Sequence, residues 1–123
     1  MTIRYKVGRT TLGGQERLYP RLTPGKAITA KQFERKVADR AARGLADVAA
    51  VLIAAREVLL EELRDEQAVR VPGMGRFSLS LKGQLGDDQR LVTGSAQIKI
   101  NFQAERALVG DVNEDLTFEF VGE

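Results

Sequence analysis

The sequence predicts an α+β fold in which helices form the middle of the chain and strands form both ends. Two patterns predict it. Apolar and polar residues alternate near residue 3 and again after residue 77, as in half-buried strands. Between these stretches, apolar residues recur every three or four positions, as in amphipathic helices. The chain of 123 residues is long enough for one domain or for half of an intertwined pair.

The first 26 residues are predicted to form a β extension. Ile3, Tyr5 and Val7 alternate with basic residues, which indicates a strand with a basic outer face. Residues 11–14 have the composition of a turn, and residues 17–19 are predicted to return as a second strand.

Two signals are expected to end this extension. Proline has no backbone N–H, so Pro20 is expected to end the second strand. The sequence Thr23-Pro24-Gly25 then breaks the chain. We therefore expect an extension over residues 1–26 and a main domain over residues 27–123.

Two helices follow. Thr29 and Gln32 fit a capping box at the start of the first helix, and Gly44 is expected to end it with a positive φ. The second helix, from about Ala46 to Leu63, carries the wide apolar stripe of a buried helix. The short turn resembles a helix-turn-helix, but the second helix is long and acidic and is a poor candidate for a DNA groove.

The remaining residues predict strands and one short helix. A short strand over residues 68–71 leads into a tight turn with two glycines at residues 72–75. The alternating segments 77–82 and 98–102 are expected to pair as a long hairpin with a protruding tip. A short helix over residues 104–109 and a final strand over residues 116–120 complete the chain.

Composition excludes several classes of chemistry. The chain has no cysteine and no histidine, which removes disulfides, thiol nucleophiles, the usual zinc sites and Ser-His catalysis. Phosphate- and dinucleotide-binding loops are absent from the sequence. We therefore expect no enzyme activity, no cofactor, no metal site and no small-molecule substrate. Residues 1–20 contain no apolar signal-peptide core, so we expect a soluble cytoplasmic protein without membrane contact.

The net charge of +2 hides a division of charge along the chain. Residues 1–43 hold eleven basic and three acidic residues and carry +8, whereas residues 44–123 carry −6. This asymmetry indicates a polyanionic partner or a charge-matched protein contact. The basic N-terminal segment therefore has three interpretations: a second DNA-contacting surface, a surface matched to the acidic half of another subunit, or a solvated face.

Two segments resemble a known family. The run Val69-Arg70-Val71-Pro72-Gly73-Met74-Gly75-Arg76-Phe77 resembles the short strand and Gly-aromatic-Gly-x-Phe signature of the HU/IHF family, bacterial histone-like DNA-bending proteins. Residues 100–108 are similar to the family's Phe-Lys-Pro-Gly-Lys-Ala-Leu segment, with Ala104-Glu105 in place of Pro-Gly. The likeness covers about residues 29–110. Residues 1–26 and the final strand are similar to a variant group with an extra N-terminal strand.

The resemblance implies an intertwined homodimer with a two-helix base, a three-stranded sheet and a β-arm in each subunit. It implies non-sequence-specific or weakly specific binding of double-stranded DNA, DNA condensation and a nucleoid location. The arm over residues 81–94 departs from the family because it contains no proline and balances two basic residues against two acidic ones. The alternative is therefore an HU-like structural or protein-interaction dimer that has lost strong DNA binding.

Seven residues become candidates for DNA contact on this resemblance. The glycines also suit a tight turn, and each cation also suits a solvated face. The basic residue near the arm tip suits a narrow minor groove, although the adjacent Asp87-Asp88 would be repelled there. This acidic pair is interpreted as part of a turn and not as an acid/base pair. The candidates are Gly73, Gly75, Arg76, Lys82, Arg90, Lys99 and Arg106.

Overall fold

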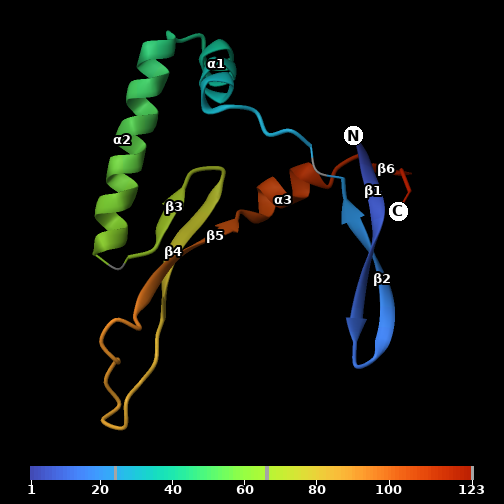
Figure 1. Cartoon of the computed structure of the whole chain (residues 1–123). Helices are drawn as coiled ribbons and strands as arrows, with labels where there is room; N and C mark the ends of the chain where they lie inside the picture. Colours follow the sequence, from blue (N-terminus) through green and yellow to red (C-terminus); the bar gives the residue numbers. More distant parts are fainter. Residues whose placement is uncertain (24, 66, 123) are drawn as a thin grey trace. The chain divides into compact units, whose positions relative to one another are not determined.

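The computed structural model describes residues 1–23, 25–65 and 67–122, and it has the predicted α+β architecture (Figure 1). Its contacts form two compact units, one made of Met1–Thr29 with Gly110–Glu123 and the other of Ala30–Val109. The C-terminal strand thus groups with the N-terminal hairpin. A boundary between residues 26 and 27 stays a prediction.

The first unit is a three-stranded sheet in the order β2-β1-β6. Strands β1 (Thr2–Leu12) and β2 (Gln15–Leu22) are antiparallel, and β6 (Thr117–Phe120) lies parallel to β1. The turn residues Gly13 and Gly14 both have positive φ, +59° and +80°, which suits a two-residue hairpin. The predicted hairpin is confirmed.

The prediction that Pro20 ends the second strand is wrong. Strand β2 continues to Leu22, and Pro20 pairs in register with Val7. Because β2 is an edge strand, a residue without an N–H is tolerated there. Pro24, the centre of the predicted break, lies outside the described residues.

The second unit begins with the two predicted helices, α1 (Ala30–Ala41) and α2 (Leu45–Arg64). Thr29 immediately precedes α1, at the position of an N-cap residue. Within the described residues, no helix combines the length and the apolar character needed to cross a membrane.

The predicted role of Gly44 is wrong. Gly44 has a φ of −66° and begins α2 as its N-cap residue, whereas Ala42 takes the left-handed conformation with a φ of +54°. Two hydrogen bonds close the end of α1: Arg43 N–H donates to the Ala38 carbonyl at 3.0 Å, and Ala42 N–H to the Asp39 carbonyl at 3.3 Å. This pattern is a Schellman motif with alanine where glycine is usual.

The strands that follow form an antiparallel sheet in the order β3-β4-β5. Its members are β3 (Val69–Val71), β4 (Gly75–Lys82) and β5 (Gln97–Ala104), and the short helix α3 (Arg106–Val112) follows. On one face of the sheet, the rings of Phe77 and Phe102 lie 4.8 Å apart. The predicted long hairpin and its strand periodicity are confirmed.

The hydrophobic core of the single chain is small. Among the described residues, the buried apolar side chains are Ala38, Val48 and Leu63. Many large apolar side chains remain exposed, including Val51 on α2 and Ile98 on β5, which are 67% and 61% exposed. Stable folds normally bury most side chains of this kind. The exposed apolar side chains of this chain therefore form a surface on which another apolar surface could pack.

Candidate nucleic-acid interface

The register of the β3-β4-β5 sheet separates its side chains into an apolar and a polar face. Residues that pair directly across antiparallel strands point to the same face. Arg76 pairs with Arg70 on one side and with Gln103 on the other, so all three share the polar face. The pairs that continue this polar face along the hairpin are Ser78 with Asn101, Ser80 with Lys99, and Lys82 with Gln97.

This polar face is positively charged. It carries Arg70, Arg76, Lys82 and Lys99, and all four side chains are exposed. Strands β3, β4 and β5 contain no aspartate or glutamate. The strands therefore present cations together with neutral hydrogen-bonding side chains, which is the surface chemistry that attracts a polyanion. We call this surface, made of the polar faces of β3, β4 and β5, the strand face.

A hollow of about 620 Å³ lies at the end of the strand face where β3 turns into β4. It brings together Arg70, Arg76 and Arg106, with Glu105 as the acidic residue among its lining. Glu105 is held at this turn because its backbone N–H donates to the Met74 carbonyl at 2.8 Å. Three guanidinium groups and one carboxylate give the hollow an excess of positive charge. Its other lining residues are Val71, Pro72, Gly73, Gly75, Gln103 and Ala104.

The two glycines of the turn have different structural roles. Gly73 has a φ of +72° and open space where a side chain would lie, so it is required for its backbone conformation. Gly75 is buried, and a Cβ there would collide with the Gln103 carbonyl and lie 2.8 Å from the Phe102 ring. Glycine at position 75 therefore allows β4 and β5 to approach closely beside the hollow.

The arm beyond the regular strands is closed by a small turn. Leu85 and Leu91 form an isolated bridge, and Gly86 N–H donates to the Arg90 carbonyl at 2.8 Å. The Asp88 carboxylate accepts a hydrogen bond from Arg90 N–H at 3.1 Å. This contact supports the interpretation of the acidic pair as part of a turn. It also keeps a carboxylate beside the basic residue of the tip.

The structure thus brings most of the predicted candidates together. Gly73, Gly75, Arg76 and Arg106 line the hollow, and Lys82 and Lys99 lie further along the strand face. Arg90 lies apart from them, in the arm. Sequence reasoning missed Arg70. Its signal was the alternation Val69-Arg70-Val71, which places Arg70 on the face that the hairpin assigns to Arg76.

Comparison with known protein families identifies a family for the chain. The family model described as an HU domain fused to a winged helix-turn-helix, Ig or glycine-rich motif matches residues 1–119. The chain belongs to this HU domain family. The resemblance inferred from Val69–Phe77 is therefore confirmed. Among curated proteins, the search found no match.

Solved structures share the HU-like fold of this chain. A protein from Bacteroides vulgatus ATCC 8482, described as a bacterial DNA-binding protein, superposes with a TM-score of 0.77 at 16% sequence identity. The match covers 99% of this chain and 49% of that one, so the chain spans about half the length of the Bacteroides protein. Anabaena HU, solved as a complex with DNA, superposes with a TM-score of 0.57 at 20% identity over 71% of this chain and 99% of that one.

Proposed function

We propose that this HU-family chain binds double-stranded DNA as a histone-like architectural protein with little or no sequence specificity. The observation that carries the proposal is the strand face, where four exposed cations meet no carboxylate in the three strands. The Anabaena HU relative, solved with DNA, supports the same ligand. The nucleoid is the cellular location that this function requires.

The chemistry of the strand face suits phosphate better than base edges. Its cations and its Ser, Asn and Gln side chains donate hydrogen bonds to phosphate oxygens without reading sequence. Cations that neutralise phosphates release condensed counterions, so the affinity falls as salt rises. We propose Arg70, Arg76, Arg106, Lys82 and Lys99 as the phosphate contacts. We propose Gly73 as the residue that lets the duplex approach the turn, with Gly75 contributing by holding β4 close to β5 beside it.

The functional unit that we propose is an intertwined homodimer. A hollow of about 650 Å³ lies between α2 and the apolar face of the hairpin and is lined by Leu60, Leu63, Leu79 and Ile98 among others. Ile98 and Ile100 are 61% and 59% exposed in the single chain. Burying each such side chain stabilises a fold by about 1.5–3 kcal/mol before entropy costs, so a second copy that covers this face gains substantial stability.

The arm supports weaker DNA bending than is usual for the family. Architectural proteins kink DNA by inserting an apolar wedge into the minor groove, and the arm has no proline for that role. Asp87 and Asp88 oppose the single cation Arg90 near the tip. This acidic tip is the observation that favours the second candidate function, an HU-like dimer that binds a protein partner and has lost strong DNA binding.

The deciding experiment is fluorescence anisotropy with a labelled duplex over a series of salt concentrations, run beside light scattering for subunit number. We expect binding at about 50 mM salt, with a slope of log affinity against log salt of roughly −0.9 for each phosphate engaged. Duplexes of unrelated sequence should bind alike. Absence of binding at low salt would contradict the DNA-binding function and favour the protein-interaction dimer.

A further inference from the structure

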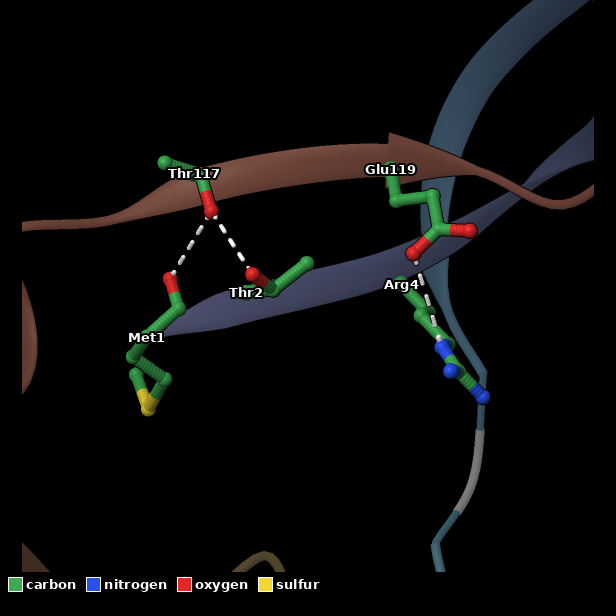
Figure 2. Close-up of polar contacts among 5 residues, drawn as sticks. All are labelled: Met1, Thr2, Arg4, Thr117 and Glu119. Atoms are coloured by element: carbon green, nitrogen blue, oxygen red, sulfur yellow. Dashed lines mark hydrogen bonds and ion pairs between the residues drawn. The ribbon is translucent and has the colours of Figure 1, made fainter.

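The sheet β2-β1-β6 has a basic face of its own, outside the strand face. Register places Arg4 and Lys6 of β1 on one side together with Arg17 and Arg21 of β2. Side-chain contacts agree with this assignment. Thr2 and Thr117 hydroxyl oxygens lie 2.9 Å apart on that side, and Arg4 lies 3.7 Å from the Glu119 carboxylate (Figure 2). We call the four cations Arg4, Lys6, Arg17 and Arg21 the N-terminal basic face.

The opposite side of the same sheet is apolar. It carries Ile3, Tyr5 and Val7 from β1, and the rings of Tyr5 and Phe120 lie 5.6 Å apart there. Arg9 also falls on this side, and its guanidinium forms a 2.6 Å ion pair with Glu16. The cations of the sheet are therefore distributed unequally between its two faces. The apolar side carries one arginine, which is paired with Glu16, and the opposite side carries four cations.

The N-terminal basic face is short of negative charge. Among the described residues of the three strands, Glu119 is the acid that register places on this face. It lies beside Arg4, at a long ion-pair distance and with both side chains more than half exposed. Lys6 and Arg21 pair directly across the two strands. Like charges directly opposite in a sheet are destabilising, so this pair lowers stability unless an anion binds between them.

The surface between these cations is partly aromatic. Tyr19 pairs with Gly8, and a Cβ at Gly8 would lie only 2.6 Å from the Tyr19 ring atom Cε2. The Tyr19 ring therefore lies against β1 at Gly8, where glycine leaves space that any side chain would fill. Tyr19 remains 43% exposed. An exposed ring among cations adds an apolar contact surface with a polar hydroxyl, beside guanidinium and ammonium groups that can meet phosphates.

We propose that the N-terminal basic face is a second phosphate-binding surface for duplex DNA, separate from the strand face. The charge of the face suits this ligand, because four cations share it with one acid and the duplex is a dense polyanion with one negative charge per about 1.7 Å of its axis. The identity of the ligand rests on the function proposed above. The surface itself rests on the register, charge and packing of this sheet.

The test removes the charge of this face and keeps its shape. In the triple variant Lys6→Gln, Arg17→Gln and Arg21→Gln, the salt slope for duplex DNA should become less steep by about 0.9 for each lost contact. Affinity at about 50 mM salt should fall at least tenfold. The thermal midpoint should stay the same or rise, because the Lys6–Arg21 repulsion is removed.

A charge-matched control distinguishes the effect of this face on DNA binding from the effect of a lower net charge. The triple variant Lys31→Gln, Arg35→Gln and Arg56→Gln removes three exposed helical cations and should change the slope far less. Equal effects of the two triple variants would overturn the inference. The strand-face variant Arg76→Gln distinguishes the two proposals: if it weakens binding while the N-terminal triple does not, only the second surface is wrong. A wild-type protein that binds no duplex would instead end the proposed function and this inference with it.

Discussion

Arg70 and Arg76 lie directly opposite each other on the antiparallel strands β3 and β4, so two positive side chains share one face of the sheet. Directly paired residues have Cβ atoms about 4.5–5.5 Å apart, and like charges at that distance destabilise the pairing. Both side chains also line the hollow beside Gly73 and Gly75. A phosphate placed between them would turn this repulsion into attraction, which makes the pair a sensitive test of DNA binding.

Replacing Arg76 by glutamine should separate stability from binding. In the absence of DNA, Arg76→Gln should raise the free energy of unfolding by a few tenths of a kcal/mol, since it removes the like-charge pair. In the presence of duplex DNA, it should weaken affinity and reduce the salt slope by about 0.9 per subunit. Chemical denaturation and anisotropy measure the two effects.

The matched control for this variant is Arg56→Gln, which removes an exposed cation from α2. It should leave the salt slope almost unchanged. An Arg76→Gln protein that binds DNA as tightly as the wild type at every salt concentration would show that the hollow does not contact phosphate.

The glycines of the turn should respond differently to the same substitution. Gly73→Ala forces alanine into a left-handed conformation in open space and should cost about 1–2 kcal/mol. Gly75→Ala adds a Cβ that collides with the Gln103 carbonyl and the Phe102 ring, so it should cost more and disturb the pairing of β4 with β5. Urea unfolding of both variants gives the order, and equal losses of stability would contradict it.

Ala42 offers a stabilising substitution. It ends α1 in the left-handed region with a φ of +54°, where glycine avoids the steric cost of a Cβ. Ala42→Gly should therefore raise the free energy of unfolding by about 0.5–1 kcal/mol, measured by urea denaturation. The control Ala41→Gly, placed in the last helical residue, should instead lower it. A destabilised Ala42→Gly protein would mean that the Schellman motif is not the main end of this helix in solution.

The sequence predicted local elements better than the contacts between distant ones. Alternation located β1, β4 and β5, and apolar periodicity located α1 and α2, because each pattern is set by neighbouring residues. The helix stop at Ala42 was missed because the glycine two residues later was the stronger conventional signal. Pairing of β6 with β1 joins residues more than a hundred positions apart, for which alternation carries no information.

The same limit applied to the candidate site. Arg76 was predicted from the turn motif, but Arg70 entered only when register placed the two opposite each other. The N-terminal basic face could be foreseen in part, since Arg4 and Lys6 alternate with apolar residues. Its β2 cations could not be assigned to a face until the extended strand fixed Lys6 opposite Arg21.

The proposed dimer can be tested at its apolar face. Ile100 is 59% exposed in the single chain and lines the hollow next to α2. Ile100→Asp should convert the dimer to monomers or to unfolded protein, which light scattering detects. The reason is that a carboxylate buried in the dimer interface without a partner is costly. The adjacent Lys99→Gln, on the opposite face, should keep the dimer. As a check that needs no variant, the thermal midpoint of the wild type should rise with protein concentration, and a constant midpoint with a monomeric mass would contradict the dimer.

The acidic arm tip should limit DNA affinity, and its two aspartates should differ. No described contact ties the Asp87 carboxylate to the turn, whereas Asp88 accepts a hydrogen bond from Arg90 N–H. Asp87→Asn should therefore strengthen binding to duplex DNA severalfold at low salt, because it removes one negative charge per arm that phosphates repel. The control Glu57→Gln, an exposed acid on α2, should change affinity much less.

Asp88→Ala should instead loosen the turn and speed hydrogen exchange of the Arg90 amide, since the acceptor is lost. If Asp87→Asn has no effect while the strand-face variants weaken binding, the arm tip does not approach the duplex, and the strand face carries the affinity without it.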